Sequence, residues 1–115
     1  MPKDYTKIEN ALRKAHAAAC EATAKEKDYP QRLDCGFAWV VTHDRAFNGW
    51  CRKMAKETGL RQTYGDKNWS TGWCFWKPGN FVGQSITGHE AGARAFRDVI
   101  LQELGINAEV GSRFD

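Results

Sequence analysis

Residues 35–42 place the strongest constraint on the fold, because this short segment is apolar and rich in aromatic and β-branched side chains. That composition predicts a buried strand. Side chains alternate between the two faces of a strand, so the apolar residues divide into Phe37, Trp39 and Val41 on one face and Ala38 and Val40 on the other. Since both faces are apolar, we expect both sides of this strand to be covered by other parts of the chain.

Residues 6–27 precede this strand and carry small apolar side chains, mostly alanine, at steps of three and four, which predicts a helix. Thr6 and Glu9 have the spacing of a capping box at its start, and Pro30 disfavours helical geometry from Tyr29 onward. An alanine stripe buries little area, so this helix needs a partner surface. We expect it to cover the second face of the sheet or to pack against a second copy of the chain, and the sequence leaves both arrangements open.

A second helix is predicted around residues 47–55, where apolar side chains again recur at helical spacing. Thr42 or Asp44 can cap its start. Gly59 is suited to end it, because glycine readily adopts the left-handed conformation that follows many helices.

The segment after this helix contains the signal for a hairpin. Pro78 and Gly79 fit the two central positions of a type II turn. We therefore predict two paired strands, over residues 72–77 and 80–86. Residues 61–71, which precede the hairpin, are predicted to form an irregular loop.

The C-terminal residues indicate a last helix and a last strand. Thr87 and Glu90 have the spacing of a second capping box, and Gly105 is suited to end the helix. Residues 106–110 then predict a short strand.

The predicted order is helix, strand, helix, strand, strand, helix, strand. Residues 35–111 thus have the βαββαβ order of a ferredoxin-like fold, in which right-handed crossovers place both helices on one face of a four-stranded sheet. Residues 1–30 add an N-terminal helix. A chain of 115 residues is long enough for one such core and too short for two. We therefore predict a single α+β domain over residues 1–115.

The charge balance limits the kind of partner the protein can have. Lys and Arg number 17 against 14 Asp and Glu, for a net charge of +3, and the excess lies in residues 35–67. This is far below the dense basic stripe of a dedicated nucleic-acid binder, so it permits an anionic partner without requiring one. No apolar run approaches the roughly 20 residues of a membrane span, and the first residues do not resemble a signal peptide. We expect a cytoplasmic protein.

The cysteines do not have metal-site spacing. Cys20, Cys35, Cys51 and Cys74 include no C-x-x-C pair, so we expect reduced thiols and no zinc site. His16 lies four residues before Cys20 on one face of the first helix, a spacing that metal sites use. We favour the alternative, a thiol packed in the core with a histidine at its margin. We expect neither a metal nor a cofactor.

Basic and aromatic residues in the middle of the chain are candidates for nucleic-acid binding. The basic residues on the outer face of the second helix and in the loop after it, together with one loop tryptophan, are Arg45, Arg52, Lys53, Lys56, Arg61, Lys67 and Trp69. Trp69, Trp73 and Trp76 crowd together, and two interpretations stay open: they fill the core, or they stack bases on an open sheet face as RNA-recognition domains do. The sequence motif of those domains is absent from residues 80–84.

The start of the last helix is a candidate anion site. Ser85, Thr87, Gly88 and His89 lie where free backbone N–H groups and the helix dipole favour a phosphate. An alternative function is therefore the binding of, or an enzymatic reaction on, a small phosphorylated ligand. Residues 83–87 are one residue short of a G-x-S-x-G elbow and the helix starts too late for one. No catalytic residue is assigned, and we favour a protein that is not an enzyme.

Several short motifs resemble a known group of sequences. These are Gly36-Phe37-Ala38-Trp39-Val40, Gly72-Trp73-Cys74-Phe75-Trp76, Gln84-Ser85, His89-Glu90-Ala91-Gly92-Ala93 and Val110-Gly111-Ser112-Arg113-Phe114-Asp115. Together, over residues 34–115, they resemble small uncharacterised proteins of tailed phages and prophages. The resemblance implies a phage accessory protein in a bacterial cytoplasm and carries no known activity. We therefore expect a non-enzymatic binding module that contacts a host or phage macromolecule, either nucleic acid or protein.

Overall fold

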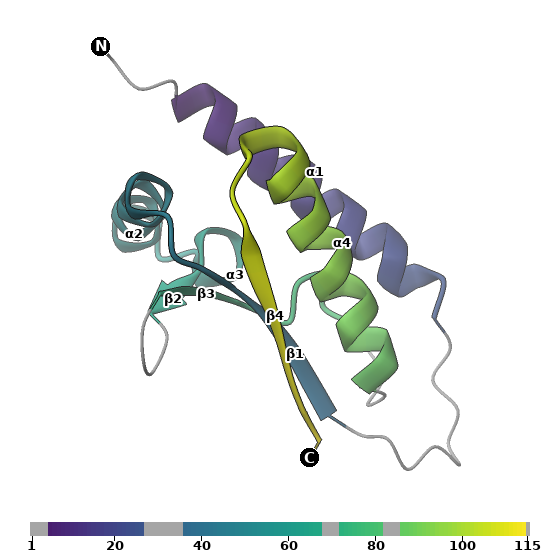
Figure 1. Cartoon of the computed structure of the whole chain (residues 1–115). Coiled ribbons are helices and arrows are strands. Elements are labelled where there is room, and N and C mark those ends of the chain that lie inside the picture. Colours follow the sequence, from purple (N-terminus) through teal and green to yellow (C-terminus); the bar gives the residue numbers. More distant parts are fainter. Residues whose placement is uncertain (1–4, 27–35, 68–71, 82–85, 115) are drawn as a thin grey trace.

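The computed structural model describes residues 5–26, 36–67, 72–81 and 86–114 (Figure 1). In this part of the chain the protein is an α+β structure of helices packed on an antiparallel sheet. The helices are α1 (Tyr5–Ala24), α2 (Arg45–Thr58), α3 (Arg61–Tyr64) and α4 (Ile86–Leu104), and the strands are β1 (Gly36–Thr42), β2 (Asp66–Lys67), β3 (Trp73–Trp76) and β4 (Ala108–Phe114). The α+β class predicted from the sequence is thus confirmed.

β1 is a central strand of the sheet, whose order is β2-β3-β1-β4 with every neighbouring pair antiparallel. Trp39 of β1 pairs with Trp76 of β3 on one side and with Gly111 of β4 on the other. Because antiparallel partners point to the same face, these registers decide which side chains share each face of the sheet.

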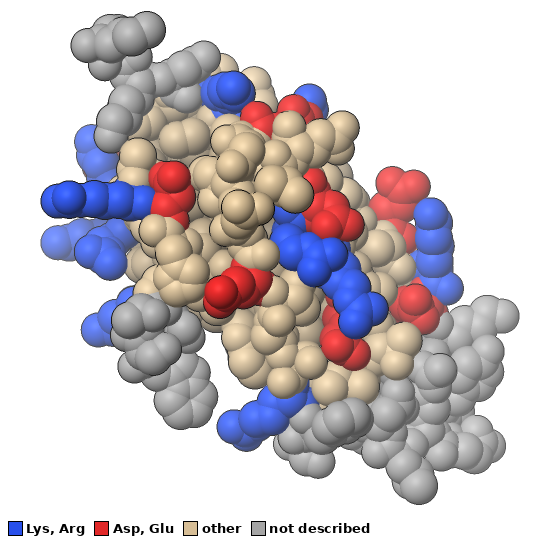
Figure 2. Space-filling view, viewed as in Figure 1, with Lys and Arg blue, Asp and Glu red and all other residues tan. Residues whose placement is uncertain are grey.

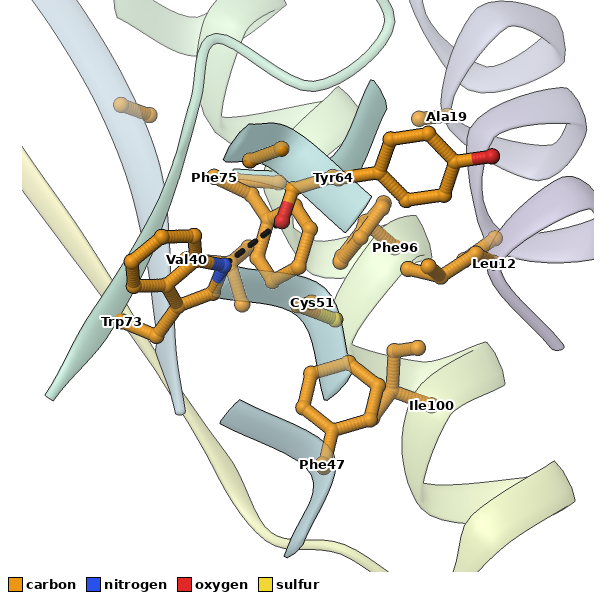
Figure 3. Packing of buried hydrophobic residues seen from close by; sticks show 14 residues of the cluster. Leu12, Ala19, Val40, Phe47, Cys51, Tyr64, Trp73, Phe75, Phe96 and Ile100 are labelled. Atoms are coloured by element: carbon orange, nitrogen blue, oxygen red, sulfur yellow. Dashed lines mark hydrogen bonds between the residues drawn. The ribbon is translucent and has the colours of Figure 1, made fainter. Parts of the chain in front are cut away.

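α1, α2 and α4 pack on one face of the sheet, and α3 lies beside the end of β3 (Figure 1). Ala38 and Val40 of β1 are fully buried against them. Phe75 of β3 contacts Phe96 of α4 and Phe47 of α2, with ring centroids 4.8 and 6.0 Å apart, and Figure 3 shows these rings in one cluster. This face of the sheet is the core face, and it supplies most of the apolar burial of the domain.

The position of α1 differs from the expectation that it covers the second face of the sheet. α1 packs along α4 on the core face, and its buried Leu12, Ala15 and Ala19 belong to the same hydrophobic cluster as the sheet. The alanine stripe explains this arrangement, because small side chains let α1 approach α4 closely. Both sides of β1 were expected to be covered. The helices cover one side, while on the other side Val41 is buried and Phe37 and Trp39 are half-buried.

The hairpin also differs from its prediction. The chain does turn at Pro78 and Gly79: the Asn80 N–H donates to the Lys77 carbonyl oxygen at 2.9 Å and Gly79 has φ +83°. Beyond the turn, however, Asn80 and Phe81 do not form a strand, and residues 82–85 lie outside the described residues. Phe81 is 8% exposed because it packs under the start of α4. Burial of Phe81 against α4 therefore keeps Asn80 and Phe81 out of the sheet.

β3 pairs instead with β2, which lies within residues 61–71, where the sequence predicts only a loop. The same segment contains the single turn of α3. Neither element is long enough to show a hydrophobic period. The last strand is also longer than predicted, because residues 111–114 continue the pairing with β1 as far as Gly36.

The predicted helix ends are mostly confirmed. The Asp44 side chain accepts a hydrogen bond from the Phe47 N–H at 2.9 Å at the start of α2. Gly59 and Gly105 follow α2 and α4 with φ of +74° and +67°. Thr87 is not the cap of α4, because the helix already includes Ile86. Thr6 likewise lies inside α1, which includes Tyr5.

Two helical glycines allow a matched test of this packing. A Cβ at Gly92 of α4 would clash with the Pro78 carbonyl oxygen and lie 2.7 Å from Thr23 of α1, whereas a Cβ at Gly49 of α2 meets nothing within 4 Å. We expect Gly92→Ala to lower the free energy of unfolding by about 1–3 kcal/mol through overpacking. Gly49→Ala should raise it by about 0.5–1 kcal/mol through helix propensity. Denaturant unfolding of both variants measures the two effects, and a stabilised Gly92→Ala variant would contradict the close approach of α1, α4 and the turn.

His16 predicts a pH dependence of stability. Its Nε2–H donates to the Thr63 carbonyl oxygen at 2.8 Å and its ring lies against Phe96, with centroids 4.9 Å apart. Burial lowers the pKa of this imidazole below its usual value, and the hydrogen bond to Thr63 partly opposes the shift. The unfolded chain then takes up the proton at a higher pH than the folded chain, so stability should fall below about pH 6.5, by at most about 1.4 kcal/mol per pH unit.

Denaturant unfolding at several pH values measures this loss. We expect it to disappear in His16→Gln, which keeps an N–H donor and does not titrate, and to persist in His43→Gln at a half-exposed site. Identical pH profiles for the wild type and His16→Gln would contradict the assignment.

Candidate functional site

The second face of the sheet carries a cluster of aromatic side chains, of which two are half-buried and one is exposed. Phe37 and Trp39 of β1 and Trp76 of β3 lie on this face, because Phe37 and Trp39 alternate with the core residues Ala38 and Val40, and Trp76 pairs with Trp39. Trp76 is 46% exposed. We call Phe37, Trp39 and Trp76 the aromatic platform, and the side of the sheet that bears it the open face.

Trp76 contacts the other two rings of the aromatic platform. Trp39 and Trp76 are stacked with ring centroids 5.5 Å apart and planes 18° apart. Phe37 lies 5.7 Å from Trp76 at a tilt of 35°. The indole of Trp39 also lies directly over Gly111, where any Cβ would clash with its Nε1. The platform therefore extends from β3 across β1 to β4.

Cationic side chains lie beside the aromatic platform. Arg61, Lys67 and Arg113 line a concavity of about 540 Å³ together with the platform. The complete lining is Phe37, Trp39, Arg61, Gln62, Asp66, Lys67, Cys74, Trp76 and Arg113. Lys77 adds a further charge, since its Nζ lies 5.5 Å from the centroid of the Phe37 ring. Asp66 forms an ion pair with Arg61 at 3.6 Å. The concavity thus combines three cations with one carboxylate beside exposed indole surface.

α3 fixes one wall of this concavity. The Gln62 amide donates to the carbonyl oxygens of Trp76 and Lys77 at 3.1 and 3.3 Å. These hydrogen bonds hold the single turn of α3 beside the end of β3. As a result Arg61 and Lys67 lie next to the platform although both precede β3 in the sequence.

The structure brings together four of the six basic residues proposed for nucleic-acid binding. Arg52, Lys56, Arg61 and Lys67 line a second concavity beside the first, next to Trp73. Arg52 lies over the Trp73 ring, 5.5 Å from its centroid. Figure 2 shows Lys and Arg side chains projecting on the side of the molecule formed by α2. The second concavity therefore continues the positive charge from the open face toward α2.

The other proposed residues are not part of this group. Arg45 and Lys53 line a separate groove on α2 with Tyr5 and Trp50. Trp69 lies outside the described residues.

The tryptophans of residues 73–76 have two different environments. Trp73 is buried, and its indole N–H donates to the Tyr64 carbonyl oxygen at 2.6 Å (Figure 3). Trp76 is three residues further along β3 and therefore points to the opposite face. Each interpretation of the tryptophan cluster thus applies to one residue: Trp73 fills the core and Trp76 belongs to the open face.

The cysteine on the open face is not an activated nucleophile. Burial and the nearby charge of Asp66 raise the pKa of the Cys74 thiol to about 11. Burial also raises the pKa of the Cys51 thiol in the core. Both are neutral near pH 7, and a thiolate is the form that reacts.

Two of the residues proposed for the anion site at the start of α4, Gly88 and His89, are buried among protein atoms. His89 is 2% exposed and lies between Phe37 and Phe81, with ring centroids 5.9 and 5.3 Å away. A Cβ at Gly88 would clash with the Phe81 ring. Thr87 is exposed, and Ser85 lies outside the described residues. A phosphorylated ligand that reached the His89 imidazole would have to displace Phe81.

The described residues contain neither a metal-binding cluster nor a membrane-spanning helix. His43 lies 3.5 Å from Glu109, and Cys20 is exposed on α1. Within the described ranges no three His, Cys, Asp or Glu side chains gather in a way that could hold a metal ion. None of the described helices is long and apolar enough to cross a membrane.

The residues at the centre of the site were only partly predicted from the sequence. Phe37 and Trp39 were not proposed as binding residues, because an apolar strand face is also typical of a covered strand. Trp76 was named only as one of the tryptophans that either fill the core or stack bases. One signal was available: Glu109 and Arg113 alternate with small or apolar residues, which indicates that one face of β4 meets solvent. Because the strand was predicted to end at residue 110, Arg113 was not recognised as part of it.

The comparisons with known proteins do not supply a relative. The chain matches no protein-family model, no curated protein and no solved structure. The resemblance to tailed-phage proteins therefore stays a prediction, and the site has to be interpreted from its geometry.

Two tryptophan substitutions test the separation of core and open face. We expect Trp76→Ala to lower the free energy of unfolding by about 1 kcal/mol, the order of one aromatic pair. Trp73→Ala should lower it by about 3–5 kcal/mol, because it opens a cavity and leaves the Tyr64 carbonyl oxygen without its donor. Denaturant unfolding measures both, and equal losses in the two variants would contradict the placement of Trp76 outside the core.

Proposed function

We propose that this protein is a non-enzymatic module that binds single-stranded nucleic acid on the open face of its sheet. The observation that carries the proposal is the aromatic platform, whose Trp76 is exposed, flanked by cations. Aromatic side chains on a protein surface stack with unpaired bases, and each such stack contributes about 1–3 kcal/mol. Neighbouring Lys and Arg side chains would hold the phosphates.

The platform favours single strands over a duplex. Bases in a duplex are stacked on one another and present only their edges, whereas a flat indole surface needs an exposed base face. Trp39 and Trp76 together offer such a surface beside Arg61 and Lys67. The second concavity, with Arg52 and Lys56, provides the path along which the sugar-phosphate backbone would continue toward α2.

The arrangement of the sheet supports the same proposal. Read from its other edge, the strand order is β4-β1-β3-β2, with α2 following β1 and α4 following β3. We propose on this basis that the domain is ferredoxin-like, with β2 as a very short second strand. RNA-recognition domains stack bases on a four-stranded sheet, and here the platform lies on the two inner strands. In the phage setting that the sequence resemblance implies, the ligand would be a host or phage nucleic acid.

The proposal predicts weak binding that depends strongly on salt. If Arg61, Lys67 and Arg113 contact three phosphates, the logarithm of the binding constant should fall with the logarithm of the salt concentration with a slope of about −2. Fluorescence anisotropy with labelled oligo(dT) and oligo(U) at several salt concentrations measures this slope. No binding of either oligonucleotide at about 50 mM salt would contradict the proposal and leave a protein partner as the better candidate.

Three substitutions assign the binding to the open face. Trp76→Ala should weaken binding about 5-fold to 150-fold through the loss of stacking. Lys67→Ala should reduce the salt slope by about 0.7. Arg97→Ala removes the same charge from α4 on the helical side of the molecule and should leave binding nearly unchanged. An equal loss in Lys67→Ala and Arg97→Ala would mean that only net charge matters.

A further inference from the structure

β4 is an edge strand whose outer side has no strand partner among the described residues. It runs for seven residues and pairs with β1 along its whole length, from Ala108 opposite Thr42 to Phe114 opposite Gly36. β2 at the other edge has only two residues. A long, regular edge strand presents a row of backbone N–H and C=O groups that another strand can pair with.

The charges on β4 are arranged symmetrically about its centre. Glu109 and Arg113 lie two residues before and two residues after Gly111. Both point to the open face, because they pair with Val41 and Phe37 of β1 while Gly111 pairs with Trp39. Both are exposed. Opposite charges at equal distances from a central residue are self-complementary in an antiparallel pair.

We infer that β4 pairs antiparallel with β4 of a second copy of this chain, about a twofold axis at Gly111. In that register Glu109 lies opposite Arg113 of the partner subunit, and Arg113 opposite Glu109 of the partner subunit. Opposite charges directly across an antiparallel pair stabilise it. Moving the centre to residue 110 or 112 loses both ion pairs, so the charges select one register.

The dimer has a continuous eight-stranded antiparallel sheet. A twofold axis perpendicular to the sheet keeps both open faces on the same side. Trp39 lies over Gly111 in each copy, so the two aromatic platforms meet on either side of the axis. The interface does not depend on the proposed function.

The experiment measures the mass of the full chain in solution over a concentration series, by native mass spectrometry and analytical ultracentrifugation. The chain has a mass of 13.0 kDa, and we expect a species of twice that mass to increase with concentration. A wild type that stays monomeric up to millimolar concentration would overturn the inference. The edge would then be free for a strand from another protein.

Charge reversal tests the register. Arg113→Glu and Glu109→Arg each place like charges opposite one another at two points, so each should raise the dissociation constant of the dimer about tenfold. The double variant Glu109→Arg/Arg113→Glu restores opposite pairs and should restore the wild-type value. Lys56→Glu makes the same change of charge beside the β2 edge and should have no effect.

Both residues are exposed, so we expect all these variants to keep the wild-type melting temperature within a few degrees. A folded single variant that dimerises as well as the wild type would overturn this interface. So would a folded double variant whose dissociation constant stays raised.

Discussion

One-sided burial of the central strand β1 is the constraint on which the rest of the structure depends. Ala38 and Val40 face a layer that contains α1, α2 and α4, and the aromatic core around Phe75 fills the space between them. Because these helices share one layer, none of them covers the other side of β1. Phe37 and Trp39 are then left half-buried beside Trp76, and of the two only Phe37 also contacts a helix, through His89 of α4. The packing of α1, α2 and α4 on one side of β1 therefore produces both the core and the candidate binding face.

Local signals in the sequence predicted the elements of the fold better than their arrangement. The helix and strand periods, the Asp44 cap and the glycines after α2 and α4 depend on neighbouring residues alone, and each is present in the structure. The side of the sheet on which α1 packs depends on contacts between distant residues, and its alanine stripe fits either side. The β2–β3 pair was missed because two residues are too few to show a strand pattern, and because the Pro78–Gly79 turn predicts a different hairpin.

The candidate site was predictable only in its charged part. Arg52, Lys56, Arg61 and Lys67 were selected as cations around the second helix, and the structure gathers them beside the open face. The aromatic part required knowledge of which strand face is covered. Trp73 and Trp76 illustrate the difficulty: their spacing of three places them on opposite faces, but only the position of the helices decides which of the two is buried.

The contact between Trp39 and Gly111 also limits which residues these two positions can carry. Glycine weakens a strand because it has no side chain to pack and much backbone freedom to lose. An aromatic side chain lying across a glycine on the neighbouring strand can compensate for that weakness. In this protein the indole occupies the space that a side chain at position 111 would need. Positions 39 and 111 therefore constrain each other. A larger residue at 111 requires a smaller one at 39. A smaller residue at 39 leaves the glycine at the centre of β4 without an aromatic side chain packed over it.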